Sequence, residues 1–305
     1  MAARRRTTGL ILLVPVLALL ASCDSRPTQA PASPQTIGRN TVRVDVDGRP
    51  VVMHVPVSYR PGSAVPLVVI LHGYSSSSAG IDSYFQLTGQ SDARGFLYAM
   101  PDGLVDRQGN RYWNATDACC DFDRTGVDDS AYLSHLIDVV RRFYTVDRVF
   151  LIGHSNGAFM AIRMACEHAD QITGIVGLNG AMWTDKSRCR PSRPVSFLDI
   201  RSDADEVIHY GGGLNGADGR TPYPSATTTD ADWRDFDRCD QQATKGAPLD
   251  LVTDLDGAET AVTSWSCAGR STLETWQIVG GSHSPRLSAA FASGVVDFMY
   301  AQGTT

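Results

Sequence analysis

The sequence predicts an α/β protein with a mostly parallel central sheet and helices on both faces. Strand-like apolar runs alternate along the chain with segments of helical periodicity, which is typical of parallel sheets covered by helices. The run PLVVILHG at residues 66–73 is continuously apolar and rich in β-branched residues, as expected of a strand that is buried on both faces. No second linker divides the chain after residue 40, so we expect a single domain over residues 41–305.

The expected elements begin at Thr41. The segment TVRVDVDGRPVVMHVPV alternates apolar and polar residues on both sides of Asp47-Gly48, which predicts a β-hairpin with a tight turn. Further strands are expected at residues 95–101, 148–153, 173–180, 194–200 and 273–281, and helices at 129–144, 156–168 and 287–300. The SSSSAG stretch predicts a loop, and residues 210–264, which contain GGGLNGADG and TPYPSATTT, predict a loop-rich insertion over the sheet.

The amino-terminal segment is typical of a secretory signal over residues 1–22. Three arginines precede an apolar stretch from Leu10 to Leu20, which is shorter than the roughly 20 residues of a membrane-spanning helix. The tetrapeptide ending in Cys23 resembles a bacterial lipobox, which implies that Cys23 carries lipid and anchors the protein to the extracytoplasmic face of a membrane. Plain secretion is the alternative. Residues 23–40 are rich in Pro, Ser, Thr and Gln and predict a flexible tether.

Composition and charge narrow the functional classes. The chain has 43% hydrophobic and 20% charged residues and a formal net charge of −6, so it offers no general attraction to nucleic acid. Apart from Cys23, the cysteines form an even set, as expected of disulfides in an oxidising compartment. A zinc site is the alternative, but no C-x-x-C spacing accompanies these cysteines, and we expect no metal. The set comprises Cys119, Cys120, Cys166, Cys189, Cys239 and Cys267.

The pentapeptide Gly153-His154-Ser155-Asn156-Gly157 follows an apolar strand pattern and precedes a helical pattern. This strand, turn and helix context is the one in which a serine between two glycines acts as a nucleophile. The glycines are expected because side chains there would collide with the neighbouring strand and helix. We therefore predict that Ser155 is a nucleophile.

A serine nucleophile needs a base and an orienting acid, which follow it in the order acid, then histidine, in hydrolases built on such a sheet. His283 follows the last predicted strand and is the expected base. The preceding strand leads into a loop with Asp203 and Asp205. We take Asp205 as the acid, with Asp203 as the alternative. His72 lies too early in the chain for the base, and we expect it to pack or hydrogen-bond around its turn.

The negative charge that develops on an ester oxygen during attack needs preorganised N–H donors. The expected donors are the main-chain N–H of Asn156, directly after the nucleophile, and that of Tyr74, in the loop after the early strand at residues 66–73. A helix that begins at Asn156 would also direct free N–H groups toward this charge.

The ordered motifs resemble the secreted polyhydroxybutyrate depolymerase and feruloyl esterase-like enzymes of the α/β-hydrolase fold, a group that includes bacterial esterase lipoproteins. The resemblance runs from about residue 50 to residue 300. The motifs that carry it are LHGYSSSS (71–78), MPDG (100–103), WNATDACC (113–120), VDD (127–129), GHSNGAFM (153–160), RMACE (163–167), DADEVIHYGGG (203–213) and GGSHSPR (280–286). The resemblance selects Asp205 as the acid and keeps Asp203 as the fallback.

The resemblance also implies disulfide pairing and a substrate contact. It pairs Cys119 and Cys120 with Cys166 and Cys189, in either order, and Cys239 with Cys267. Trp113 matches a position common in these enzymes, where it would line the acyl pocket or pack in the core.

The function expected from these observations is a serine carboxylic-ester hydrolase that forms an acyl-enzyme. The resemblance implies feruloyl or acetyl esters on polysaccharides, or hydroxyalkanoate esters, as substrates. No metal or organic cofactor is implied. One alternative is an envelope acyltransferase with the same triad, and another is a binding lipoprotein that has lost the reaction.

Overall fold

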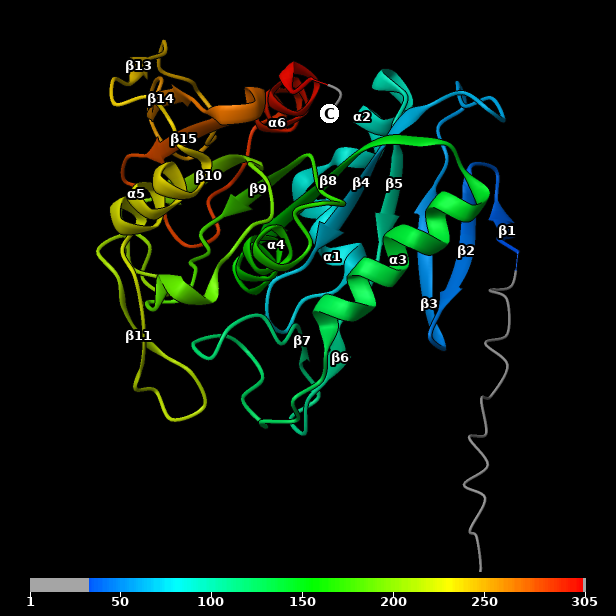
Figure 1. Cartoon of the computed structure of the whole chain (residues 1–305), viewed down its shortest axis with the longest axis horizontal. Helices are drawn as coiled ribbons and strands as arrows, with labels where there is room; N and C mark the ends of the chain where they lie inside the picture. The colour runs from blue at the N-terminus through cyan, green and yellow to red at the C-terminus, as the bar shows by residue number, and fades with distance from the viewer. Residues whose placement is uncertain (1–32, 304–305) are drawn as a thin grey trace, which may run out of the picture. The chain divides into compact units, whose positions relative to one another are not determined.

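The computed structural model describes residues 33–303. The predicted signal segment, Cys23 and most of the predicted tether lie outside these residues. Within the described part, the chain forms an 11-stranded sheet with helices on both faces (Figure 1). The strand order is β1-β2-β3-β5-β4-β8-β9-β10-β15-β14-β13. The predicted fold class is confirmed.

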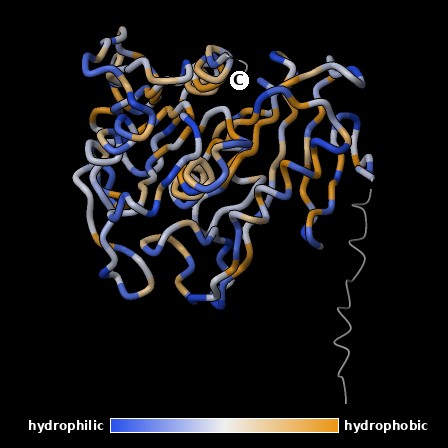
Figure 2. Tube along the Cα trace, in the orientation of Figure 1, coloured by the Kyte–Doolittle hydropathy of each residue, from blue (hydrophilic) through white to orange (hydrophobic). Residues whose placement is uncertain are grey.

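The middle of the sheet is parallel, and its strands are mostly hydrophobic (Figure 2). Residues Leu67–Leu71 of β4 are almost completely buried, as expected of a strand that helices cover on both sides. The parallel strands are β5 (Leu97–Met100), β4 (Val65–Leu71), β8 (Val146–His154), β9 (Gly174–Leu178), β10 (Ser196–Ser202) and β15 (Thr272–Ile278).

Antiparallel strands extend the sheet at both edges. One edge carries β3 (Arg49–His54), β2 (Thr41–Val46) and β1 (Gln35–Gly38), and the other carries β14 (Thr260–Ser266) and β13 (Thr244–Lys245). The predicted hairpin is confirmed, with Asp47 and Gly48 both at positive φ in its turn. The predicted tether boundary at residue 40 is wrong, because β1 already pairs with β2 from Gln35.

The helices divide between the two faces of the sheet. One face packs against α3 (Asp129–Phe143), α4 (Asn156–Glu167) and α5 (Ala226–Asp237), and the other against α1 (Ser78–Phe85), α2 (Leu87–Arg94) and α6 (Ala289–Ala301). Short elements in the loops are β6 (Leu104–Val105), β7 (Arg111–Tyr112), η1 (Lys186–Arg188), β11 (Gly213–Asn215), β12 (Thr221–Tyr223) and η2 (Ala268–Arg270). No helix among residues 33–303 is long and apolar enough to cross a membrane.

Two segments differ from the sequence prediction. Helix α1 begins at Ser78, inside the SSSSAG stretch for which the sequence predicts a loop, and α2 follows it up to Arg94. Ser77 caps α1 by accepting a hydrogen bond from the Gly80 N–H, and Phe85 anchors the helix in the core. Residues 210–264 are not only an insertion, because they supply α5 and β14. The hydropathy pattern of β14 predicts a strand only weakly, because most of its side chains are only partly buried.

The disulfides correct one predicted pairing. Cys239 bonds to Cys267, as expected. Cys119 and Cys120 bond to each other, however, and Cys166 bonds to Cys189. The physical reason is proximity. Cys166 near the end of α4 lies directly against Cys189, with a Cα–Cα distance of 4.7 Å, which suits a bridge. The adjacent pair sits in its own loop, where the Cys119 and Thr116 main chains hydrogen-bond to each other.

Gly157 and Gly89 provide a matched test of close packing, because both lie in helices. A Cβ on Gly157 would overlap the main-chain carbonyl of Leu71, whereas one on Gly89 would meet nothing within 4 Å. We expect Gly157→Ala to lower the free energy of unfolding by about 2 kcal/mol. Gly89→Ala should raise it by about 0.5 kcal/mol because alanine favours helix. Urea denaturation measures both changes, and a Gly157→Ala variant as stable as the wild type would contradict the close approach.

Candidate active site

The carboxyl ends of the parallel strands meet at one edge of the sheet. There, β4 leads into Gly73-Tyr74, β8 into Ser155, β10 into Asp205 and β15 into His283. The chain therefore delivers the predicted triad and oxyanion residues to the same edge from separate strands.

Ser155 occupies a sharp turn between β8 and α4. Its backbone lies at φ 54° and ψ −123°, a conformation that L-residues rarely adopt and that marks functional positions. A Cβ on Gly153 would overlap the main chain of Gly157. The predicted requirement for both glycines is confirmed, since the strand and helix pass too close for side chains on either one.

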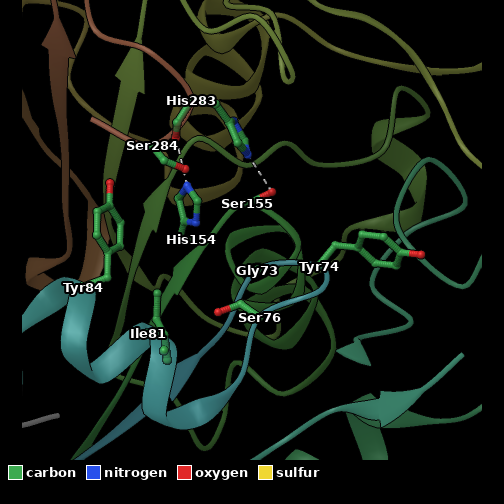
Figure 3. Close-up of a pocket in the computed structure, with 10 residues that line it drawn as sticks. Gly73, Tyr74, Ser76, Ile81, Tyr84, His154, Ser155, His283 and Ser284 are labelled. Atoms are coloured by element: carbon green, nitrogen blue, oxygen red, sulfur yellow. Dashed lines mark hydrogen bonds between the residues drawn. The ribbon is translucent and has the colours of Figure 1, made fainter. Parts of the chain in front are cut away.

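The imidazole of His283 lies within hydrogen-bond distance of both Ser155 and Asp205. The Ser155 hydroxyl is 2.9 Å from Nε2 of His283 (Figure 3), and Nδ1 of His283 is 2.8 Å from Oδ2 of Asp205. The alternative acid, Asp203, is exposed and instead accepts hydrogen bonds from the Gly280 N–H and the Gln277 amide. Asp205 is therefore the carboxylate that the fold brings to His283.

The orientation of the Asp205 carboxylate is fixed by its other contacts. Its side chain is completely buried, and Oδ1 accepts hydrogen bonds from the main-chain N–H groups of Val207 and Ile208, both at 2.8 Å. Oδ2 is left to face His283. A carboxylate held in this way can orient the imidazole and stabilise its charged form.

The predicted oxyanion donors lie beside the serine. A Cβ on Gly73 would be 3.4 Å from Cβ of Ser155, so the Gly73-Tyr74 turn packs directly against the nucleophile. Within residues 33–303, neither the Tyr74 N–H nor the Asn156 N–H donates a hydrogen bond to another protein atom. The Tyr74 side chain points away from Ser155 (Figure 3), and its hydroxyl donates to Asp106.

His72 is buried beneath this turn and makes hydrogen bonds that hold it. Its Nδ1–H donates to the Gly73 carbonyl at 2.8 Å, and its Nε2 accepts from the Gly103 N–H at 2.9 Å. Burial lowers the pKa of His72, which favours the neutral ring that this pattern requires. The expectation that His72 hydrogen-bonds around its turn is confirmed.

Trp113 does not line the pocket, so the predicted substrate contact is wrong. The side chain is fully buried, and its Nε1–H donates to the His72 carbonyl at 3.1 Å. The Trp113 N–H donates to Oδ1 of Asn156, and the Asn156 amide donates back to the Trp113 carbonyl. Trp113 thus joins the two segments that present the candidate oxyanion donors.

Sequence reasoning missed two buried side chains that contact the main chain of His283. Nε2 of His154 and Nδ2 of Asn179 both lie 2.9 Å from the His283 carbonyl oxygen. Burial, together with the nearby His283, lowers the pKa of His154 to about 4. Only their positions in the sequence could have indicated these two residues. His154 ends β8 and Asn179 follows β9, so both lie at the sheet edge that carries Ser155.

A pocket of about 260 Å³ opens at Ser155. Ile81 and Tyr84 of α1 form part of its wall (Figure 3). Sequence reasoning did not find these two residues because it predicted a loop where α1 begins. The lining residues are Gly73, Tyr74, Ser76, Gly80, Ile81, Tyr84, His154, Ser155, His283 and Ser284.

The described residues contain no cluster of three or more His, Cys, Asp or Glu side chains that could hold a metal ion. The site described above brings together a serine, a histidine, a carboxylate and nearby main-chain N–H groups. On a mostly parallel sheet, a strained serine between strand and helix defines the α/β-hydrolase class.

Comparison with known proteins supports this class. A family model described as serine aminopeptidase, S33, matches residues 62–204 and ends one residue before Asp205. "Putative esterase NocK" of Nocardia uniformis subsp. tsuyamanensis is 28% identical over 251 residues, which cover 71% of this chain and 69% of that protein.

Two longer proteins are similar in part. Feruloyl esterase B of Piromyces equi is 25% identical over 207 residues, and poly(3-hydroxyalkanoate) depolymerase C of Paucimonas lemoignei is 26% identical over 247 residues. These matches cover 66% and 75% of this chain but only 38% and 57% of the relatives.

Among solved structures, an acetyl xylan esterase from Aspergillus awamori superposes with a TM-score of 0.57 at 15% identity, over 82% of this chain and 93% of that one. The likeness shows a shared fold. The chain has the α/β-hydrolase fold and is a hydrolase of the esterase kind.

The contacts of Trp113 predict a specific kinetic change in Trp113→Phe, which removes the indole N–H but keeps an aromatic ring. We expect kcat for nitrophenyl esters to fall about fivefold, because one neutral hydrogen bond contributes about 1 kcal/mol. KM should change by less than about twofold for acyl chains of any length, since the ring is outside the pocket.

Trp233→Phe is the matched control, because Nε1 of Trp233 donates to the Val195 carbonyl and neither residue lines the pocket. Trp233→Phe should lower the free energy of unfolding by about as much as Trp113→Phe does, and it should leave kcat unchanged. A KM that rises with acyl length only in Trp113→Phe would instead place Trp113 against the substrate.

Proposed function

We propose that this protein hydrolyses carboxylic esters through a Ser155–His283–Asp205 triad and a covalent acyl-enzyme. The observation that carries the proposal is the continuous pair of contacts from Ser155 Oγ to His283 Nε2, at 2.9 Å, and from His283 Nδ1 to Asp205 Oδ2, at 2.8 Å. Such a chain of contacts activates a serine hydroxyl, which is otherwise a poor nucleophile at neutral pH.

Acylation begins when Oγ of Ser155 attacks the ester carbonyl carbon and its proton passes to Nε2 of His283. Asp205 stabilises the imidazolium that forms. The N–H groups of Tyr74 and Asn156 donate to the oxygen that becomes negative, which requires no rearrangement at the moment of attack.

The tetrahedral intermediate then collapses. The bond between the carbonyl carbon and the alcohol oxygen breaks, and His283 returns its proton to that oxygen. Water attacks the acyl-enzyme with His283 again as the base, which releases the carboxylic acid and restores Ser155. Apart from the ester and water, the groups that take part in these steps are side chains and main-chain groups of this chain.

The pocket and the relatives guide the choice of substrate. At about 260 Å³, the pocket accommodates a compact acyl group, and Ile81 and Tyr84 provide an apolar wall. The similar proteins named above include a feruloyl esterase and a poly(3-hydroxyalkanoate) depolymerase, and an acetyl xylan esterase shares the fold. We therefore propose feruloyl or acetyl esters of polysaccharides, or hydroxyalkanoate esters, as the substrate class.

Labelling with a fluorophosphonate tests the nucleophile. We expect one adduct per chain by intact mass, mapped to Ser155 by peptide analysis and absent in Ser155→Ala. An activated serine forms this adduct because the reagent mimics the acyl group under attack. A folded wild-type protein that forms no adduct would contradict the triad and favour a binding protein.

The two neighbouring aspartates supply a matched pair within the same experiment. Asp205→Asn should lower the labelling rate and kcat by about 10³- to 10⁴-fold, because the imidazole loses its orienting carboxylate. Asp203→Asn should stay within about threefold of the wild type, since the Asp203 carboxylate accepts hydrogen bonds from Gln277 and the Gly280 main chain and not from the His283 imidazole. Equal losses in both variants would overturn the assignment of Asp205.

We also propose that the protein is exported and held at the membrane by lipid on Cys23. The Cys166–Cys189 and Cys239–Cys267 bridges support export, because disulfides persist in oxidising compartments. The full-length wild type expressed in a bacterium should partition into detergent and gain acyl mass at Cys23, whereas Cys23→Ser should not. Wild-type protein recovered without acyl mass would favour plain secretion.

A further inference from the structure

The main chain of His283 is held by side chains from three other elements. His154 at the end of β8 and Asn179 after β9 both contact its carbonyl oxygen, at 2.9 Å each. Glu206 accepts a hydrogen bond from its N–H at 3.1 Å. His283 lies in a loop entered through Gly280-Gly281, so its position depends on these contacts rather than on regular secondary structure.

The contact with His154 has only one possible direction. A carbonyl oxygen cannot donate, so His154 must donate from Nε2–H, which leaves Nδ1 without a proton in the neutral ring. His154 is 9% exposed, and its ring packs between two others. Its centroid lies 4.9 Å from that of His283 and 5.4 Å from that of Tyr84 (Figure 3).

The surroundings of His154 favour an uncharged donor. The titratable groups that face it are His283, Asp205 and Tyr84. Burial and the nearby His283 lower its pKa to about 4, so the ring is neutral at physiological pH. A positive charge at this position would oppose the imidazolium that must form on His283 during acylation. A neutral histidine supplies an N–H without that repulsion.

We propose that His154 is a positioning residue for the reaction: by donating to the His283 carbonyl, it holds the imidazole at the distance from Ser155 that proton transfer needs. This inference rests on the proposed function. Misplacement of a reacting group by about 1 Å can cost about 10²-fold in rate. His154 therefore acts through His283 and touches no reacting atom itself.

Two substitutions distinguish the effect of the hydrogen bond to the His283 carbonyl from the effect of ring packing. His154→Phe keeps a ring but removes the donor, and His154→Gln places an amide N–H near the position of Nε2. We expect kcat and the fluorophosphonate labelling rate to fall about 30- to 100-fold in His154→Phe, with KM within about twofold. His154→Gln should retain kcat within about fivefold of the wild type.

Loss of folding is excluded by thermal unfolding of each variant and by a remote control. His54 is also buried and bonded, to Asp92, so His54→Phe should cost stability without changing kcat. The proposal is overturned if His154→Phe stays within about threefold of the wild type. It is also overturned if His154→Gln is as slow as His154→Phe, because the ring rather than the donor would then matter.

Crystal structures of the wild type and His154→Phe give a readout that does not depend on activity. We expect the distance from Nε2 of His283 to Oγ of Ser155 to lengthen beyond hydrogen-bond range in the variant. An unchanged distance would overturn the proposal. If the wild type itself fails to label at Ser155, the proposed function fails, and these structures still test how His283 is held.

Discussion

The close approach of two main chains at the Ser155 turn is the constraint on which the site depends. Strand β8 runs directly into α4, and α4 lies so close to β4 that Gly157 has no room for a Cβ beside the Leu71 carbonyl. The same turn holds Ser155 at positive φ. It also brings the loop after β4 against Ser155, so the steric restriction that exposes the hydroxyl places the candidate oxyanion donors next to it.

The order of the strands brings distant parts of the chain together. Ser155 and His283 are separated by 128 residues, and Asp205 and His283 by 78. Yet β8, β9, β10 and β15 are consecutive neighbours in the sheet. Because these strands are parallel, their carboxyl ends share one edge. Asn179, from the strand between those of Ser155 and Asp205, then contacts the loop that carries His283.

Two buried histidines support this edge without adding charge. His72 holds the Gly73-Tyr74 turn, and His154 contacts the main chain of His283. Burial lowers the pKa of each, so both rings serve as neutral hydrogen-bonding groups. This matters because the chemistry proposed here develops a positive charge on His283 and a negative charge beside Tyr74. A charged side chain at either position would change the stability of these developing charges. A neutral histidine fixes the geometry of the site without that effect.

By itself, the sequence determined the fold class and the residues at the turn, because these follow from local patterns. Continuous apolar runs specify buried parallel strands, and Gly153 and Gly157 report a steric demand that no other residue satisfies. Chain order also indicated His283 and Asp205 as partners, whose catalytic roles stay predictions. Only the tertiary structure decided that Trp113 packs away from the pocket, that Cys119 bonds to Cys120, and that His154 reaches His283. These depend on which side chains face each other across separate elements, and such contacts leave no periodic signal in the chain.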